Sequence, residues 1–435
     1  MPITVIGGRG PHGLATHLWM RDRGLEGVYA LVDPAPDWLP LYDDAGPGRF
    51  TDHLRSPHEL DFALGDPGRS MRAWCEPDGQ RPLADAYGFA DVADAHANGN
   101  LPPARRVGRR PFLRYARALA CTTGAEDAVL RARVERLTPG PTGWTVDLDD
   151  GRTFGTRVVL LATGMTPHLR VPESWRAWWS RLPADQAELA LTADARPERL
   201  QGKRLAVLGS SNVGAWEAAL WAARNGAHVT LLCRRGVPIE RQLPFEAAWF
   251  RPDVIEAFGR LEPRERLRRL KRTHVPRSTL PGLPAAVLAH GVRVVCGARV
   301  QGATELWGGV QVLWSDPHGD RAEPFDLVWA ATGGDPRPRE LPFLANAVGA
   351  GRGPVVVGGP ARQLPVMDAV GRWKQLPPLY PLGHLALPRA GLAATTLASA
   401  SRYLPTVLPH ALADAGLAVG QRAERRAPDP LEVAA

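Results

Sequence analysis

Three glycines in the first part of the chain have the spacing of a phosphate-binding turn. They are Gly8, Gly10 and Gly13, within the stretch GGRGPHG at 7–13. In a G-x-G-x-x-G turn the first glycine permits a tight bend, the second lets the backbone approach a pyrophosphate, and the third lets helix and sheet pack closely. Unpaired N–H groups at the helix N-terminus then face the phosphates. The candidate dinucleotide-binding residues are therefore Gly8, Gly10, Pro11, His12 and Gly13.

The residues on either side of this turn supply the context that the motif needs. We expect a strand at 3–6, a helix at 13–23 and a second strand at 28–32, which together make a β-α-β unit. Asp33 ends the second strand, about twenty residues after the last glycine. A carboxylate there accepts hydrogen bonds from the hydroxyls of an adenosine ribose. The turn is therefore predicted to bind an unphosphorylated adenosine such as that of FAD; the alternative is a glycine turn without a ligand.

A variant of the same unit recurs in the middle of the chain. A strand expected at 204–208 leads into the turn at 209–214, an alanine-rich helix and a strand at 228–233. Serine replaces the middle glycine, and two arginines rather than an acid follow the second strand. Guanidinium groups pair with a 2′-phosphate through charge-assisted bonds, which predicts NADPH here; the alternative is that the arginines only end a strand at the surface. The candidate residues are Gly209, Ser210, Ser211, Asn212, Gly214, Arg234 and Arg235.

An Ala-Thr-Gly stretch follows an apolar strand in each half of the chain. Small residues at a strand end allow the backbone and a bound cofactor to lie close together. Because the two stretches follow the two dinucleotide turns, they support the same assignment. The candidate residues are Ala162, Thr163 and Gly164 in the first stretch, and Thr332 and Gly333 in the second.

The alternation of strands and helices predicts an α/β fold with two Rossmann-like dinucleotide-binding domains. We expect a discontinuous FAD domain, with the NADPH domain inserted into it. The FAD domain would comprise residues 1–165 and 326–410, the NADPH domain residues 166–325, and a flexible tail residues 411–435.

Three further segments are expected to complete these domains. Residues 34–110 form an irregular excursion rich in Pro, Gly and Asp, which we place near the flavin. Residues 240–289 form a basic helical insertion in the NADPH domain. A helix is expected at about 391–404. The excursion and the insertion are the segments expected to shape the substrate pocket.

Composition indicates an ordinary globular chain and argues against several functions. No run approaches the roughly 18 apolar residues of a membrane span, and the N-terminus lacks a signal peptide, so we expect a cytoplasmic protein with no membrane partner. The net charge of +8 is spread over short arginine runs, so we expect no nucleic-acid partner. The cysteines form no C-x-x-C pair, which argues against a dithiol reductase and against a metal site.

The motifs, taken in order, resemble those of a known superfamily. VIGGRGPHGL, LLATGMTP, VLGSSNVGAWEAAL and WAATGGDPRP resemble the two-dinucleotide-domain flavoproteins. The chain looks most like flavin-containing monooxygenases, particularly the ornithine and lysine N-hydroxylase branch, whose first turn reads G-x-G-P-x-N. Gly13 stands where that branch carries asparagine. The resemblance covers nearly the whole chain and implies FAD at the first turn and NADPH at the second.

The resemblance also indicates which residues lie beside the flavin. LRSPH at 54–58 is similar to the segment that approaches the flavin after the first β-α-β unit. A Leu-Gly pair at 382–383, followed by the helix start at 391–394, is similar to the C-terminal flavin-binding element, whose helix dipole would stabilise negative charge on the flavin. The candidate catalytic residues are His53, Arg55, Ser56 and His58, and the further cofactor-binding candidates are Gly383 and Leu392.

The resemblance implies an FAD-dependent, NADPH-using monooxygenase that transfers one oxygen atom from O2 to a small nucleophilic substrate, such as an amine nitrogen. Two alternatives stay open. One is an NAD(P)H-dependent flavin reductase that passes electrons to a quinone or a carrier. The other is a flavin-binding regulatory or partner protein without turnover. The sequence specifies neither the substrate nor an oligomeric state.

Overall fold

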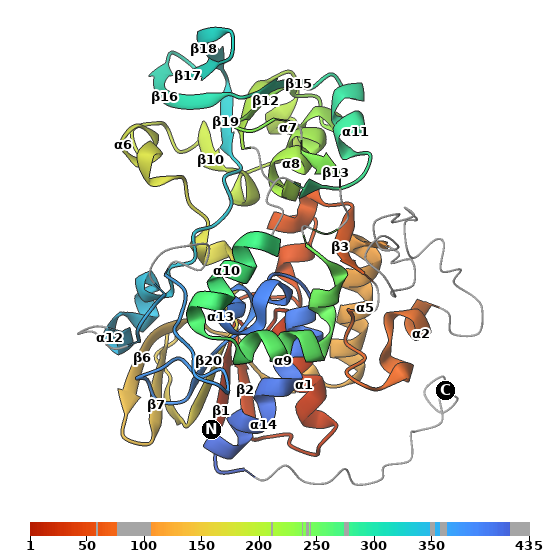
Figure 1. Cartoon of the computed structure of the whole chain (residues 1–435), viewed down its shortest axis with the longest axis vertical. Helices are drawn as coiled ribbons and strands as arrows, with labels where there is room; N and C mark the ends of the chain where they lie inside the picture. The colour runs from red at the N-terminus through yellow and green to blue at the C-terminus, as the bar shows by residue number, and fades with distance from the viewer. Residues whose placement is uncertain are drawn as a thin grey trace.

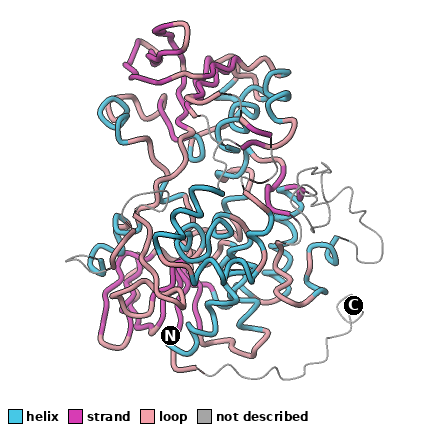
Figure 2. Tube along the Cα trace, viewed as in Figure 1, coloured by secondary structure: helices cyan, strands magenta, loops and turns pink. Residues whose placement is uncertain are grey.

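The computed structural model describes residues 1–57, 60–75, 106–209, 212–236, 238–240, 243, 245–273, 278–348, 353–356 and 363–417. The chain forms two bodies, one above the other in Figure 1, and each contains a five-stranded sheet. All pairings in these two sheets are parallel. Helices and loops surround the strands of both bodies (Figure 2). The prediction of an α/β fold with two Rossmann-like domains is confirmed.

The sheet of the lower body has β1 at its centre. In spatial order its strands are β20 (Leu379–Pro381), β9 (Val158–Leu161), β1 (Ile3–Ile6), β2 (Tyr29–Val32) and β5 (Val129–Leu130). Every residue of β1, β2 and β9 is buried, as parallel strands covered on both faces require. Helix α1 (Pro11–Arg21) joins β1 to β2 and begins before the expected residue 13. Proline suits that first helical position because it needs no N–H partner there.

The sheet of the upper body includes a strand that lies beyond the domain boundary expected at residue 325. In spatial order its strands are β10 (Ala187–Leu189), β19 (Leu327–Ala330), β11 (Arg204–Leu208), β12 (His228–Cys233) and β15 (Arg293–Cys296). Helices α8 (Asn212–Arg224) and α11 (Leu283–Ala289) pack against each other beside it. Because β19 pairs with both β10 and β11, the upper body extends past the expected boundary at 325 to the end of β19.

Each body also carries an antiparallel three-stranded sheet. The lower body carries β6 (Val134–Gly140), β7 (Gly143–Leu148) and β8 (Thr153–Thr156), and the upper body carries β16 (Arg299–Leu306), β17 (Gly309–Asp316) and β18 (Gly319–Phe325). Three short helices are α6 (Arg176–Trp179), α7 (Pro197–Leu200) and α12 (Ala345–Val348).

The described part of the 34–110 excursion is built of short elements. They are the 3-10 helices η1 (Pro40–Tyr42), η2 (Pro47–Phe50) and η3 (Pro67–Arg69), helix α2 (Met71–Cys75), and strands β3 (His53–Pro57) and β4 (Arg106–Gly108). β3 pairs with β4 in antiparallel fashion, and helix α5 (Arg109–Thr122) follows at once. Part of the excursion, residues 58–59 and 76–105, lies outside the described residues.

The 240–289 insertion, expected from the sequence to lie in the NADPH domain, packs largely on the lower body. It contains β13 (Ile239–Glu240), η9 (Ala247–Phe250), α9 (Pro252–Arg260), α10 (Pro263–Thr273) and β14 (Ser278–Thr279). Helices α9 and α10 contact α13 (Leu387–Ala390) and lie on the lower body in Figure 1. Trp249 and Phe258 are buried in the core of the lower body. The insertion therefore covers the C-terminal part of the lower body.

The C-terminal part differs from the single helix expected at 391–404. It forms η12 (Gly383–Ala386), α13, η13 (Gly391–Thr395), a π-helical turn η14 (Ser399–Tyr403) and α14 (Leu404–Asp414). A φ of +65° at Gly391 and an extended Thr396 interrupt the helix. Ala411 and Leu412 on α14 are fully buried. The flexible tail expected from 411 therefore does not begin before the end of α14.

Candidate cofactor-binding sites

The glycines of the first turn differ in what surrounds them, and the difference matches their predicted roles. A Cβ on Gly13 would overlap the carbonyl oxygen of Gly8, and a Cβ on Gly8 would lie 2.6 Å from the Leu31 Cβ. These two glycines therefore allow helix α1 and strand β2 to approach the turn. A Cβ on Gly10 would have one close neighbour, the Gly7 oxygen at 3.3 Å. The Cβ position of Gly10, directly before α1, is thus open on its other sides, and this recess would let a pyrophosphate approach the backbone.

Asp33 lies beside the same turn. Its carboxylate accepts hydrogen bonds from the backbone N–H of Arg9 (3.0 Å) and of Ala35 (2.9 Å). The side chain is partly exposed, and each carboxylate oxygen can accept a second hydrogen bond. The geometry therefore fits both the support of the turn and the recognition of ribose hydroxyls.

Sequence reasoning missed a charged cluster that holds Arg9, the residue between the first two glycines of the motif. Arg9 is 5% exposed, and its guanidinium donates two hydrogen bonds to Glu126, at 2.9 and 2.6 Å. The Trp38 indole also donates to Glu126, at 2.6 Å, and its ring lies 5.7 Å from the guanidinium carbon. Glu126 lies on η5 (Ala125–Ala128), more than a hundred residues away in sequence, so no local spacing could indicate it.

His12 connects the first turn to the C-terminal part of the lower body. Its Nε2 lies 2.9 Å from the buried Ser399 hydroxyl, and its ring packs against Gly383, where a Cβ would lie 3.1 Å from Cε1. Burial lowers the pKa of His12 to about 4, so the ring is neutral near pH 7. The structure thus brings together two predicted cofactor-binding residues, His12 and Gly383, from opposite ends of the chain.

The first Ala-Thr-Gly stretch also reaches this turn. The Ala162 N–H donates to Ile6 at 2.8 Å, and a Cβ on Gly7 would overlap the Ala162 carbonyl oxygen. The Thr163 hydroxyl is buried and has no hydrogen-bond partner among the described residues. A buried hydroxyl without a partner costs free energy. Thr163 therefore has unused hydrogen-bonding capacity for a bound group, and Gly164 follows it with a φ of +67°.

The second turn follows β11 in the upper body. A Cβ on Gly209 would overlap the Ala331 carbonyl oxygen at the end of β19, so this glycine permits close packing. Gly214 has open space around its Cβ position and does not take the packing role of Gly13. Asn212 begins α8. Ser210 and Ser211 lie outside the described residues.

The two arginines predicted to follow β12 are available for an anion. Arg234 is exposed and Arg235 is partly exposed. Across the described part of the chain, neither guanidinium forms a hydrogen bond or an ion pair. Arg234 follows Cys233, the last residue of β12, next to the end of β11. Both side chains are therefore placed to pair with an anionic ligand without giving up a contact to another described residue.

The second Ala-Thr-Gly stretch lies where the chain passes between the bodies. The Thr332 hydroxyl donates to the Arg170 carbonyl at 3.0 Å, and the Gly333 carbonyl accepts from the Arg170 N–H at 3.5 Å. Leu169 and Gly334 form an antiparallel bridge. Thr332 and Gly333 thus join two crossing segments, a role that their position after a strand did not indicate.

The predicted catalytic residues on β3 do not point to one place. The Ser56 hydroxyl is buried and accepts a long hydrogen bond, 3.5 Å, from the Leu397 N–H of the C-terminal part. The Arg55 guanidinium instead donates to the Ser278 hydroxyl at 3.2 Å, on β14. His53 is partly exposed, and His58 lies outside the described residues. Side chains alternate along a strand, so neighbours face opposite sides. Ser56 therefore reaches the predicted flavin element.

A tryptophan from the insertion covers that element. The Trp249 indole occupies the space where a Cβ on Gly391 would lie, and the adjacent Leu392 is 4% exposed. Arg269 on α10 lies over the Trp249 ring, at 5.3 Å from its centroid. The predicted residue Leu392 is thus part of an apolar wall, and Trp249 is a residue of that wall that sequence spacing did not indicate.

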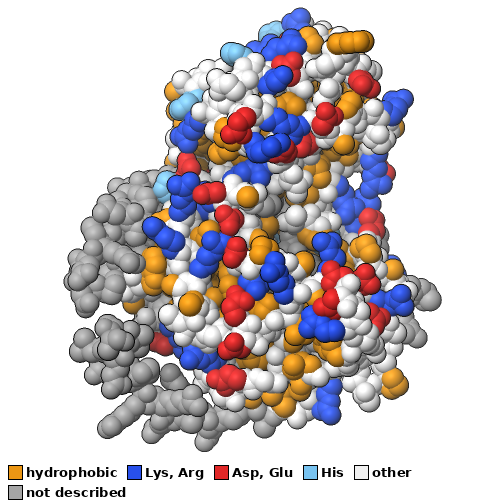
Figure 3. Space-filling model, turned by 180° about the vertical axis from the view of Figure 1, so that it is seen from behind, with side chains coloured by type: hydrophobic (Ala, Val, Ile, Leu, Met, Phe, Trp, Pro, Cys, Tyr) orange, Lys and Arg blue, Asp and Glu red, His pale blue; other side chains and the backbone are white. Residues whose placement is uncertain are grey.

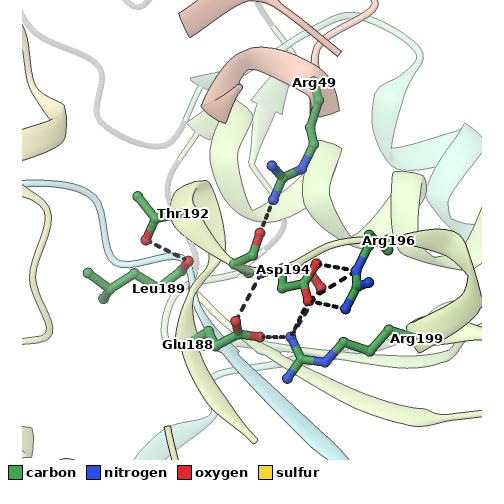
Figure 4. Close-up of polar contacts among 8 residues, drawn as sticks. Arg49, Glu188, Leu189, Thr192, Asp194, Arg196 and Arg199 are labelled. Atoms are coloured by element: carbon green, nitrogen blue, oxygen red, sulfur yellow. Dashed lines mark hydrogen bonds and ion pairs between the residues drawn. The ribbon is translucent and has the colours of Figure 1, made fainter. Parts of the chain in front are cut away.

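A groove of about 1140 Å³ lies between the two bodies, away from these turns. None of the predicted site residues that the structure describes lines it. Its charged residues are largely paired, for example Asp194 with Arg196 at 2.8 Å (Figure 4) and Asp44 with Arg109 at 2.6 Å. The groove therefore belongs to the contact between the bodies, with little uncompensated charge.

The surface and the remaining side chains add little further chemistry. On the face seen in Figure 3, basic and acidic side chains lie interspersed. Within the described residues, no group of three His, Cys, Asp or Glu side chains could hold a metal ion. No described helix is long and apolar enough to cross a membrane.

Comparisons with known proteins place this fold. Neither a protein-family model nor a curated protein sequence matches the chain. By structure it is similar to the reduced form of an ornithine hydroxylase from Pseudomonas aeruginosa, with a TM-score of 0.72, 16% identity, and coverage of 95% of this chain and 99% of that one. It is also similar to an ornithine N-hydroxylase from Kutzneria sp. 744, solved with reduced FAD, NADP⁺ and L-ornithine, with a TM-score of 0.72, 15% identity, and coverage of 94% of this chain and 98% of that one.

A flavin-containing monooxygenase from Stenotrophomonas maltophilia is a more distant match by structure, with a TM-score of 0.57, 20% identity, and coverage of 95% of this chain and 98% of that one. The chain thus has the fold of two-dinucleotide-domain flavoproteins, over nearly its whole length. The resemblance inferred from the sequence is confirmed at the level of the fold.

Proposed function

We propose that the protein is an FAD-dependent, NADPH-using monooxygenase that inserts one oxygen atom from O2 into a small nucleophilic substrate, such as an amine nitrogen. NADPH supplies two electrons, and the second oxygen atom leaves as water. The observation that carries the proposal is the contrast between the two turns: one has Asp33 beside it, and the other has two arginines without a partner among the described residues. The named activities of the structural neighbours, ornithine hydroxylases among them, support it.

In the proposed first site, each residue acts on a different part of FAD. The recess at Gly10 and the N-terminus of α1 accept the pyrophosphate. Asp33 accepts hydrogen bonds from the ribose, and the buried Thr163 hydroxyl donates to the bound cofactor. Bound FAD supplies electron transfer and oxygen activation, which no side chain of this chain can perform.

The proposed second site uses charge to select its nucleotide. Arg234 and Arg235 pair with the 2′-phosphate of NADPH, a group that NADH lacks. Because neither arginine has a partner among the described residues, the pairing breaks no existing ion pair.

The wall around the proposed flavin element excludes water. Trp249 and Leu392 are 2% and 4% exposed, and Ser56 contributes a buried hydroxyl. Exclusion of water strengthens electrostatic interactions inside a site and limits side reactions of the bound group. The neutral His12 holds the first turn against Ser399 without bringing a charge into this region.

The described cysteines give no support to a dithiol reductase. Cys233 and Cys296 are register partners on β12 and β15, although they lie far apart in sequence. Burial raises the pKa of both thiols, that of Cys233 to about 12. Since the thiolate is the reactive form, neither thiol is activated: Cys233 is buried and Cys296 is partly exposed. Transfer to a quinone or a carrier is the alternative that the experiment below must exclude.

The test is a reaction balance with the purified, FAD-loaded protein. NADPH oxidation, O2 consumption, H2O2 release and product formation are measured over a panel of primary amines, diamines and thioethers. We expect at least one amine for which hydroxylated product forms and H2O2 release falls. Rapid NADPH-dependent reduction of a quinone, with no oxygenated product from any compound in the panel, would establish the reductase instead.

A further inference from the structure

A segment of the lower body is inserted into the hydrophobic core of the upper body. Residues 49–55, which we call the clamp segment, run from the end of η2 through most of β3. Phe50 is 5% exposed and belongs to the core of the upper body. Its ring centroid lies 5.3 Å from that of Trp221 on α8 and 5.7 Å from that of Trp329 on β19. The clamp segment therefore contributes an aromatic side chain to a core built by another part of the chain.

Polar contacts with α8 flank this aromatic anchor. The Thr51 hydroxyl donates to the Glu217 carboxylate at 2.5 Å, and Glu217 is only 5% exposed. Asp52 pairs with Arg224 at 2.9 Å, although both side chains are exposed and the pair adds little free energy. The two contacts lie about two turns apart on α8, on either side of Trp221. They fix the position of the clamp segment along the helix.

The ends of the clamp segment contact two further parts of the upper body. Arg49 donates to the carbonyl of Ala193, in the loop after β10 (Figure 4), and its guanidinium lies over the Phe50 ring. Arg55 donates to the Ser278 hydroxyl at 3.2 Å. Contacts of the clamp segment thus reach four parts of the upper body: the loop after β10, helix α8, strand β14 and, through Phe50, strand β19.

Arg109, the first residue of α5, anchors the clamp segment to the lower body. Its side chain is 6% exposed and donates to the carbonyls of Thr51 at 3.0 Å and Tyr42 at 2.6 Å, while its N–H donates to the Asp52 carbonyl at 2.9 Å. The same helix buries Phe112 in the lower core. A continuous set of buried contacts therefore runs from the lower core to α8.

We infer that the clamp segment is a positioning element that holds the two dinucleotide turns at one relative orientation. Helix α8 begins at Asn212, within the second turn at 209–214, so whatever fixes α8 fixes that turn. The segments that pass from one body to the other limit how far the bodies can separate, whereas a packed aromatic side chain also fixes their relative orientation. Bodies without such a contact are expected to move relative to each other. In the proposed function, this orientation serves hydride transfer from NADPH to the flavin, and that part of the inference rests on the proposed function.

The first test measures orientation without any cofactor. Small-angle X-ray scattering of the apoprotein is compared for the wild type, Phe50→Ala, Phe50→Leu and a control, Phe154→Ala, which removes a partly buried phenylalanine from β8. We expect a larger radius of gyration for Phe50→Ala, partial recovery for Phe50→Leu, and no change for the control. An unchanged scattering profile for a folded Phe50→Ala variant overturns the inference. If that variant does not fold, Thr51→Val and Phe50→Leu replace it, with the same expected direction.

The second test measures the consequence for the reaction. In anaerobic stopped flow we expect Phe50→Ala to slow flavin reduction by NADPH at least tenfold, while FAD content, the Kd for NADPH and reduction by dithionite change less than twofold. Equal reduction rates in wild type and Phe50→Ala overturn the positioning role. A wild-type protein that binds neither cofactor would refute the proposed function instead, and the scattering result would still decide whether the clamp orients the bodies.

Discussion

Two substitutions in the first turn, Gly10→Ala and Gly13→Ala, should separate cofactor binding from folding. The new Cβ at Gly10 would meet a single atom, the Gly7 oxygen at 3.3 Å, and Gly10 has an ordinary φ of −80°. Alanine there requires the Gly7 carbonyl to shift by only a few tenths of an ångström, so its effect on stability should stay within about 1 kcal/mol. The same Cβ fills the recess before α1, so FAD affinity should fall at least tenfold, or about 1.4 kcal/mol.

Gly13→Ala should behave in the opposite way. Its Cβ would overlap the carbonyl oxygen of Gly8, and a backbone atom cannot give way as a side chain can. Overpacking of this kind costs about 1–3 kcal/mol. The apoprotein itself should therefore unfold at a lower urea concentration.

The assay is urea unfolding of both apoproteins, followed by titration of the folded proteins with FAD and detection by quenching of flavin fluorescence. A Gly10→Ala protein that is folded and binds FAD as tightly as the wild type would refute the recess as the pyrophosphate site. A Gly13→Ala protein of unchanged stability would refute the close packing of α1 on the turn.

Three further predictions concern the buried polar groups of Arg9, Thr163 and His12. Glu126→Gln should destabilise the protein by about 1–3 kcal/mol in urea unfolding, because it weakens the pairing of the buried Arg9 guanidinium; the exposed Glu135→Gln is the control and should change nothing. Thr163→Val should leave apoprotein stability equal or higher, since the buried hydroxyl has no partner, but should weaken FAD binding several-fold by the same titration; unchanged affinity would remove Thr163 from the site. Burial lowers the pKa of His12 to about 4, so between about pH 6.5 and pH 4 the unfolded chain binds a proton that the folded protein does not. The contribution of His12 to stability is therefore present above pH 6.5 and decreases as the pH is lowered towards 4. Between pH 7 and 5 this contribution should fall by about 2 kcal/mol, and His12→Gln should lose correspondingly less stability over the same range; equal losses in both proteins would contradict the burial of a neutral ring.

The two sheets and the first turn were predictable because their determinants are local. The buried strands β1, β2 and β9 are short apolar runs, and the glycines at 8, 10 and 13 act within a few residues of one another. Asp33 lies beside the turn as its spacing indicates. Patterns of this kind depend only on neighbouring residues, so they can be recognised without knowledge of the rest of the fold.

The contacts between distant segments were not predictable in the same way. Nothing near Phe50 in sequence indicates Trp221 as its partner, and nothing near Arg9 indicates Glu126. The packing of the insertion on the lower body depends on the contact between Trp249 and Gly391. A side chain at 391 would overlap the Trp249 ring, and this is visible only once the two segments are placed together. Likewise, the boundary expected at 325 ignored β19, whose apolar run suits either sheet by composition and joins the upper one by pairing.

The central claim is that the first turn binds FAD and the second binds NADPH. It is tested most directly by mixing the purified, FAD-loaded protein anaerobically with NADPH or with NADH and following flavin absorbance. We predict that NADPH reduces the flavin at least tenfold faster than NADH at equal low concentration, and that an Arg234→Ala/Arg235→Ala variant loses this preference. A protein that binds no FAD, or that is reduced equally fast by both nucleotides, would contradict the account.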